Sequence, residues 1–134
     1  MSVCPCTSGK AFNTCCGRFI FSSKADLQRK PAAKTPEQLM RSRFTAYALG
    51  NYGDYLLATW WPLTSQHLSS VELSQKSCEW VRLDVLEKGQ KGNDGWVSFC
   101  AWYLDENGSE QAMCERSTFK RENGRWYYVD GDVS

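Results

Sequence analysis

The spacing of hydrophobic residues changes near position 80 and predicts helices before that point and strands after it. Met40, Phe44, Tyr47 and Ala48 recur at the spacing of one helix face. From residue 80 onward hydrophobic and polar residues alternate instead, which is typical of half-buried strands. We therefore expect an α+β domain in which the helices pack on one face of a sheet.

Capping signals predict where the helices begin and end. Thr35 can cap the first helix, with Pro36 at its first position and Gln38 closing a capping box. Gly50 is a suitable C-terminal stop. A proline and a second capping box delimit two shorter helices further along the chain. The three predicted helices cover residues 35–49, 54–61 and 69–76.

The alternating part of the chain is divided by turn signals. The segments KGQKGNDG, DENGSE and ENG separate four runs that have strand character. Because the connections between successive strands are short, we expect an antiparallel meander. The predicted strands cover residues 80–88, 96–104, 111–120 and 125–129.

The first 22 residues are rich in Cys, Gly and Ser and show neither helical nor strand periodicity. Something other than a hydrophobic core is expected to order them. Residues 23–34 have the composition of a basic linker. The predicted organisation is therefore a small knuckle over 1–22, a linker over 23–34 and an α+β domain over 35–134, with separate sources of stability for the knuckle and the domain.

The cysteines of the knuckle have the spacing of a metal site. Two close pairs, Cys4 with Cys6 and Cys15 with Cys16, flank a short loop and can supply the four thiolate ligands of one tetrahedral zinc ion. Disulfides within such close pairs would be strained. A redox role for the adjacent pair and an iron–sulfur cluster remain as alternatives.

Composition places the chain among folded proteins of the cytoplasm. It has 42% hydrophobic and 13% aromatic residues, which suits one domain with an aromatic core. No apolar stretch is long enough for a membrane span or a signal peptide, so no membrane association is expected. In a reducing compartment disulfides are rare, and we expect Cys78, Cys100 and Cys114 to be small buried hydrophobes.

The net charge of +1 conceals an uneven distribution. Residues 1–34 carry six basic side chains and one acidic side chain, which leaves an excess of acidic residues in the rest of the chain. Bulk nucleic-acid binding by the main body is therefore not expected, whereas the N-terminal segment can meet an acidic partner.

The string CPCTSGKAFNTCCG resembles the SEC-C motif, the zinc knuckle at the tail of SecA-type translocase ATPases. Cys16 stands where SecA usually has His, and Thr7 where the motif usually has Gly. The resemblance implies a zinc site, and it implies docking on an acidic protein surface, because the SecA knuckle contacts such a surface of its chaperone partner.

The stretches PEQLMRSRFTAYALGNYGDYLLATWWP and ERSTFKRENGRWYYVDG resemble the YchJ-like family of bacterial proteins. This resemblance implies a cone-shaped domain of the nuclear-transport-factor-two-like class after the knuckle. Trp61 stands where a His is expected, and longer members are expected to carry a second knuckle after the last strand.

A cone of this class implies a cavity between the long helix and the sheet. We expect Glu115 to be buried and paired with Arg43, either as an ion pair that fixes the packing of helix and sheet or as a ligand-binding or catalytic pair. The polar candidates are Arg41, Arg43, Glu115, Arg116, Ser117 and Asp130, and the aromatic candidates are Trp60, Trp61, Trp80, Trp126 and Tyr128.

The sequence contains no Ser-His-Asp, P-loop or HExxH pattern, and its one histidine, His67, is expected on the surface. A zinc-binding interaction module is therefore favoured over an enzyme, with a basic knuckle that docks an acidic partner and a cone that binds a partner or a small ligand. The alternatives are a small-molecule enzyme with Glu115 or Asp130 as general base, and a thiol redox or metal-handling protein.

Overall fold

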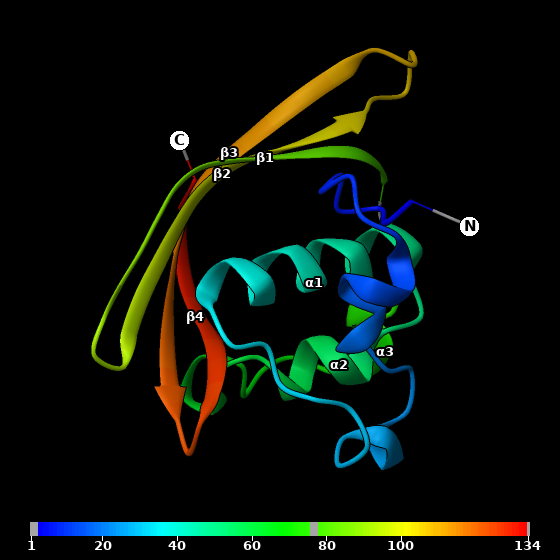
Figure 1. The fold of residues 1–134 in the computed structure, drawn as a ribbon. Coiled ribbons are helices and arrows are strands. Elements are labelled where there is room, and N and C mark those ends of the chain that lie inside the picture. The colour runs from blue at the N-terminus through cyan, green and yellow to red at the C-terminus, as the bar shows by residue number, and fades with distance from the viewer. Residues whose placement is uncertain (1–2, 76–77, 134) are drawn as a thin grey trace.

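The computed structural model of the 134-residue chain describes residues 3–75 and 78–133. Three α-helices lie on one face of a curved sheet, and the N-terminal segment packs against the long helix (Figure 1). This arrangement confirms the predicted α+β class. The helices are α1 Pro36–Leu49, α2 Gly53–Ala58 and α3 Ser70–Leu73.

The long helix α1 has the predicted capping signals at both ends. The Thr35 hydroxyl accepts a hydrogen bond from the Gln38 N–H at 3.1 Å, and the Gln38 side chain reaches back to the Lys34 N–H at 2.8 Å. Gly50 ends the helix with a φ of 73°, a conformation that glycine adopts without steric cost. The local sequence therefore positions α1 independently of the rest of the chain.

The two short helices are shorter than predicted. Helix α2 ends at Ala58 instead of residue 61, because the next residues pair with the last strand. The Trp61 N–H donates to the Tyr128 carbonyl at 2.7 Å, and the Tyr128 N–H donates to the Thr59 carbonyl at 2.8 Å. Helix α3 covers Ser70–Leu73, and residue 76 of its predicted range lies outside the described residues.

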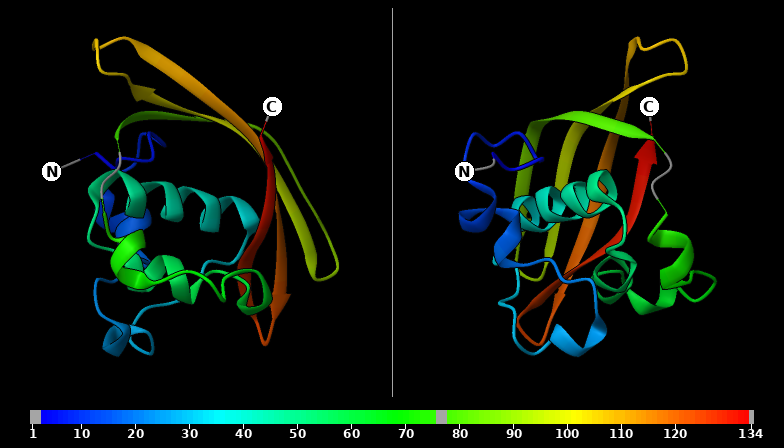
Figure 2. Two further views of the ribbon diagram at one scale, coloured as in Figure 1. Left: turned by 180° about the vertical axis from the view of Figure 1, so that it is seen from behind. Right: turned by 90° about the vertical axis from the view of Figure 1, so that its right-hand side faces the viewer.

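The strands form the predicted antiparallel meander in the order β1-β2-β3-β4. Bulges in the β1–β2 and β3–β4 pairings bend the sheet, which wraps around α1 (Figure 2). The strands extend beyond most of their predicted limits: β1 Glu79–Lys91, β2 Asp94–Leu104, β3 Glu110–Glu122 and β4 Arg125–Val133.

Hydrophobic packing joins the N-terminal segment to the helices. Phe19, Ile20 and Phe21 form a buried cluster with Tyr55 and Leu56 of α2. The four knuckle cysteines belong to the larger cluster that joins α1 to the inner face of the sheet. The division into knuckle, linker and domain remains a prediction about folding units, but in space these parts are in contact.

The linker segment also makes specific contacts. The backbone N–H of Lys24 donates to the Asp54 carboxylate at 2.9 Å, and the Lys30 ammonium donates to the Gly17 carbonyl at 3.0 Å. A short 3-10 turn over Lys24–Asp26 is capped by Ser23. Residues 23–34 therefore lie against both the knuckle and α2.

The prediction that Cys100 and Cys114 are free, buried thiols is wrong. The two residues face each other across β2 and β3, and they form a disulfide. Both are half-buried. Their separation of 14 residues says nothing about pairing until the register of the two strands is known.

Candidate metal centre and aromatic cavity

The knuckle is a tight loop whose two ends are brought together by backbone pairing. Val3 and Ala11 form an antiparallel bridge, and the Cys4 N–H donates to the Lys10 carbonyl at 2.9 Å. Two 3-10 turns, Phe12–Thr14 and Cys16–Arg18, then carry the second cysteine pair back toward the first. This local fold explains why two separated pairs of cysteines converge.

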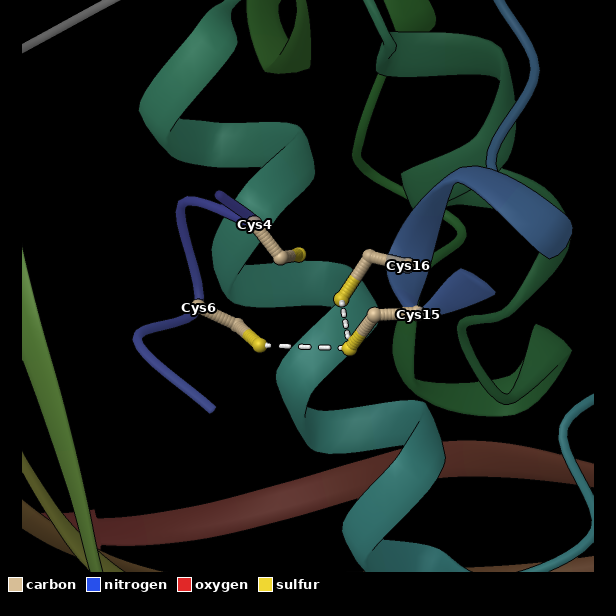
Figure 3. A group of neighbouring side chains, drawn as sticks. All are labelled: Cys4, Cys6, Cys15 and Cys16. Carbon is tan, nitrogen blue, oxygen red and sulfur yellow. Dashed lines mark hydrogen bonds between the residues drawn. The ribbon is translucent and has the colours of Figure 1, made fainter. Parts of the chain in front are cut away.

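The four sulfur atoms lie at distances that suit one tetrahedral metal ion. All are within 4.8 Å of one another, with Cys6 Sγ at 3.6 Å from Cys15 Sγ and Cys15 Sγ at 4.0 Å from Cys16 Sγ (Figure 3). Zinc–sulfur bonds of about 2.3 Å place the ligands of a tetrahedron roughly 3.8 Å apart. The residues present therefore fit zinc, which would cross-link the two ends of the knuckle. This set is Cys4, Cys6, Cys15 and Cys16.

Neighbouring groups support this cluster of buried sulfurs. The Ser8 hydroxyl is 3.2 Å from Cys15 Sγ, and the hydroxyl of Thr45, a fully buried residue of α1, is 3.7 Å from Cys4 Sγ. The Arg41 guanidinium donates to the Cys6 carbonyl at 3.1 Å. Hydroxyl and cationic groups around thiolates orient the ligands and offset their charge.

The thiols perturb one another because they are buried together. A hydrogen bond from the Cys16 thiol, which outweighs the opposing effect of burial, lowers the pKa of Cys6 to about 4. The hydrogen bond to Cys6 and burial raise the pKa of Cys16, and burial raises the pKa of Cys15. One thiolate is thus favoured at the expense of the others, and a bound cation would stabilise all four in the ionised form.

A groove of about 540 Å³ opens beside the cluster, between the knuckle, the N-terminus of α1 and the end of β1. We call it the basic groove, because among its described lining residues four side chains are cationic and one is a carboxylate. The carboxylate of Glu37 bonds to Lys88 and, at 2.9 Å, to Arg41. The cationic side chains are Lys10, Arg18, Arg41 and Lys88.

A second cavity, of about 230 Å³, lies between α1 and the inner face of the sheet. We call it the aromatic cavity. Its walls include Phe44, Trp60, Trp80 and Tyr128, and its polar residues are Arg43, Glu115 and Ser117. The structure thus brings together six of the predicted candidates. They come from α1, the segment after α2, β1, β3 and β4. The six are Arg43, Trp60, Trp80, Glu115, Ser117 and Tyr128.

The other five predicted candidates lie outside the cavity. Arg41 lines the basic groove, Arg116 is on the outer face of the sheet, and the remaining three are Trp126, Trp61 and Asp130. Trp126 is buried in the core, and its indole N–H donates to the Lys34 carbonyl at 3.2 Å. Trp61 packs edge-on against Tyr127, with ring centroids 5.7 Å apart. Asp130 is exposed and accepts a hydrogen bond from the Gly131 N–H at 2.7 Å.

A bulge in β4 explains the position of Asp130. Strict alternation would place residue 130 on the inner face with Tyr128. The register instead shifts between Thr118 and Phe119, so that Phe119 pairs with Tyr128 and Ser117 with Gly131. The extra residue moves Gly131 to the inner face in place of Asp130.

The expected direct pair of Arg43 with Glu115 is wrong: among the described residues no ion pair joins them. Arg43 is 4% exposed and donates through Nη1 to the Leu56 carbonyl at 2.8 Å and the Thr59 hydroxyl at 2.7 Å. Glu115 Oε2 instead accepts from the Ser117 hydroxyl and, at 3.3 Å, from the Tyr128 hydroxyl. The Glu115 carboxylate bonds to nearby hydroxyls instead of to the Arg43 guanidinium, and no sequence pattern indicates this pairing.

The other candidates occupy ordinary positions. Arg116 is exposed on the outer face of β3, with its guanidinium 5.6 Å from the Trp96 ring, and His67 is exposed as predicted. The cavity also contains residues that the sequence reasoning did not assign to it. Tyr47 continues the predicted apolar stripe of α1, while Phe99 and Met113 alternate with outer-face residues on their strands, so these patterns could have identified them.

The fold and the cysteine cluster together define a protein with a SEC-C knuckle and a nuclear-transport-factor-two-like domain. Residues 35–131 match the family described as YchJ, middle NTF2-like domain. The chain belongs to this YchJ-like family. The resemblance noted from the sequence is thereby confirmed.

Several known proteins are similar over nearly the whole chain. A UPF0225 protein of Serratia proteamaculans is 41% identical over 96% of this chain and 82% of its own length. A UPF0225 protein of Sodalis glossinidius is 44% identical over 97% of this chain and 82% of its own length. The solution structure of a SEC-C motif containing protein from Rhodopseudomonas palustris is 35% identical, with a TM-score of 0.82 and 98% of each chain covered.

Within the described part of the chain, no helix has the length and apolar character that a bilayer crossing requires.

Proposed function

We propose that this protein is a zinc-binding interaction module whose basic groove docks an acidic protein surface and whose aromatic cavity binds a small ligand. The observation that carries this proposal is the convergence of four buried cysteine sulfurs directly beside the basic groove. Cys15 and Cys16 belong to both features, so a metal ion that orders the knuckle would also set the shape of the groove.

The charge of the groove supports docking to an acidic partner. Lys10 is exposed at the rim, and Lys88 keeps 61% of its side chain accessible despite its ion pair with Glu37. Exposed cations of this kind speed association with an acidic surface and make it sensitive to salt. The SEC-C resemblance supports the same kind of partner.

The cavity supports the second part of the proposal. Small-molecule sites are mostly apolar clefts with a few convergent polar groups, and the aromatic cavity has that composition. We place the protein in the cytoplasm, because an unoxidised four-thiolate site is typical of a reducing compartment. The Cys100–Cys114 disulfide is unusual for that compartment.

The metal content of the purified protein tests the proposed zinc site. Protein purified without chelator should contain about one zinc per chain, and X-ray absorption should give zinc–sulfur distances of about 2.3 Å from four ligands. The double variant Cys6→Ser with Cys15→Ser should lose the metal. Wild-type protein without bound metal, or with the same metal content as the double variant, would contradict the proposal.

Binding of a fluorescently labelled poly-glutamate peptide tests docking. We expect wild-type affinity to fall with rising salt, and Lys10→Glu to weaken binding at least about threefold by charge reversal at the groove. Lys120→Glu is the matched control, since Lys120 lies on β3 outside the groove and the net charge changes equally. Equal losses in both variants would show that the groove is not the docking site.

A further inference from the structure

The cavity residue Arg43 is a buried cation, and no carboxylate of the described residues is in contact with it. Its two hydrogen bonds go to a carbonyl and a hydroxyl, both neutral and both through Nη1. Its guanidinium carbon lies 4.8 Å from the centroids of both the Trp60 and the Tyr128 rings. The two ring faces stabilise the cation, but they leave its Nε and Nη2 hydrogens without an acceptor among the described residues.

Buried charges in proteins are normally paired with an opposite charge. The pKa of Arg43 is lowered, chiefly by burial, but a guanidinium stays protonated at neutral pH. Trp60 lines the same side of the cavity with its ring, against which the Arg43 guanidinium packs, whereas its indole N–H is buried away from the open space. This side of the cavity therefore suits an anionic group.

Glu115 presents the opposite chemistry. Its Oε2 accepts from Ser117 and Tyr128, and no described residue donates to its Oε1. Burial and the charge of Glu115 raise the pKa of Tyr128, so the phenol keeps its proton and acts as a donor. The carboxylate is thus oriented by two hydroxyls while one oxygen remains available to a cationic donor.

Tyr128 links the two sides. Its ring packs on the Arg43 guanidinium while its hydroxyl bonds to Glu115, so the two charges are separated by about one side chain. The cavity that contains both charges is also lined by Phe44, Trp80 and other apolar side chains. A volume of about 230 Å³ equals that of about eight water molecules at roughly 30 Å³ each, which is enough for a small molecule.

We propose that the aromatic cavity binds a small zwitterion with an apolar side chain, of the free amino-acid class, with its carboxylate toward Arg43 and its ammonium toward Glu115. This proposal rests on the cavity part of the proposed function and adds the class of ligand. The ligand carboxylate would accept from Arg43 N–H groups that have no acceptor among the described residues. The ligand ammonium would donate to the Glu115 oxygen that has no donor among them. The apolar remainder replaces water against the aromatic walls.

Isothermal titration with L-leucine and two analogues tests this class. The analogue 4-methylpentanoate lacks only the ammonium, and 3-methylbutylamine lacks only the carboxylate. We expect each to bind roughly tenfold more weakly than leucine, or worse, because hydrogen bonds to charged groups are the strong ones. In ¹H–¹⁵N spectra leucine should shift the indole N–H signal of Trp60.

Two variants, each with a matched control, test which residue binds the carboxylate of leucine and which binds its ammonium. Arg43→Met should remove the preference for leucine over 3-methylbutylamine, and Glu115→Gln should remove the preference over 4-methylpentanoate. Arg116→Met and Glu110→Gln, at exposed positions of the same sheet outside the cavity, should leave both preferences unchanged. If Arg43→Met does not fold, as judged by its ¹H–¹⁵N spectrum, Arg43→Lys is used and should reduce the same preference.

The outcomes separate this inference from the function on which it rests. Equal binding of leucine and both analogues would overturn the zwitterion class and leave a ligand-binding cavity. Tighter binding of 4-methylpentanoate than leucine would also overturn it, in favour of a simple anion. Absence of binding by all three compounds, with no shift of the Trp60 signal, would overturn both the class and the cavity part of the proposed function.

Discussion

The candidate metal centre is a buried cluster of four cysteines, whereas Glu115 and Tyr128 of the aromatic cavity are half-buried, and the residues of the two sites are assembled differently. All four cysteines lie within residues 4–16, and one loop with two short turns brings them together. The polar groups of the cavity come from α1, the segment after α2, β3 and β4. A site made by one short segment can be recognised from spacing, whereas a site made by several elements depends on how they pack.

The two sites also satisfy their polar atoms differently. In the candidate metal centre the sulfurs face one another, and only a shared cation can satisfy all four as thiolates. In the cavity Arg43 and Glu115 each have protein partners, but none of opposite charge among the residues that the structure describes. The knuckle should therefore depend on its metal for stability, while the cavity should tolerate the absence of its ligand.

Loss of the metal should have the largest effect. Structural zinc contributes about 10–16 kcal/mol in zinc-finger peptides, and we expect Cys6→Ser with Cys15→Ser to cost several kcal/mol. Hydrogen exchange should report opening of residues 3–22, and the unfolding midpoint of the body should also fall, because the cysteines share a core with α1. Cys78→Ser, outside the cluster, is the control. An unchanged midpoint for the body would show that knuckle and body are independent folding units.

Removal of the Cys100–Cys114 disulfide should have the next largest effect. These residues join β2 to β3, the strands that carry Phe99, Met113 and Glu115 of the cavity wall. A disulfide that closes a loop of this length is worth about 3 kcal/mol in the chain-entropy description. Denaturant unfolding of Cys100→Ala with Cys114→Ala should show a loss of that order. No loss would mean that hairpin pairing already provides the constraint.

Gly131→Ala should lower the free energy of unfolding by about 1–3 kcal/mol, because the added methyl group overpacks the wall of the aromatic cavity. A Cβ at this position would lie 2.2 Å from Glu115 Oε2 and 2.9 Å from the Tyr128 hydroxyl. The variant should displace the carboxylate and leave zinc content unchanged. Thr118→Ala, on the exposed face of the same strand pair, controls for changes in sheet stability. Equal stability of Gly131→Ala and wild type would mean that Glu115 moves without cost.

The smallest effect is expected for the coupling between Arg43 and Glu115. A contacting buried pair would cost about 3–5 kcal/mol when one partner is removed. Because hydroxyls and carbonyls bond to the two groups instead, a double-mutant cycle with Arg43→Met and Glu115→Gln should give a coupling below about 1 kcal/mol. A larger value would restore the direct pair expected from the sequence.

Much of the fold could be predicted because it depends on local signals. Thr35, Pro36 and Gly50 delimit α1 through contacts with their immediate neighbours, and alternation with short turns predicts the meander. The cysteine spacing predicts the metal centre for the same reason. Cys4 and Cys16 are only twelve positions apart, so they cannot lie far from each other in space. The identity of the four clustered sulfurs can therefore be predicted from the sequence.

Tertiary structure decided the details that depend on register. One extra residue in β4 moved Asp130 out of the cavity and Gly131 into it. The pairing of β2 with β3 placed Cys100 opposite Cys114, and the end of α2 supplied the partners of Arg43. Strand register and helix ends depend on packing energies summed over many residues, so a shift of one position changes which side chains meet while the local pattern stays the same.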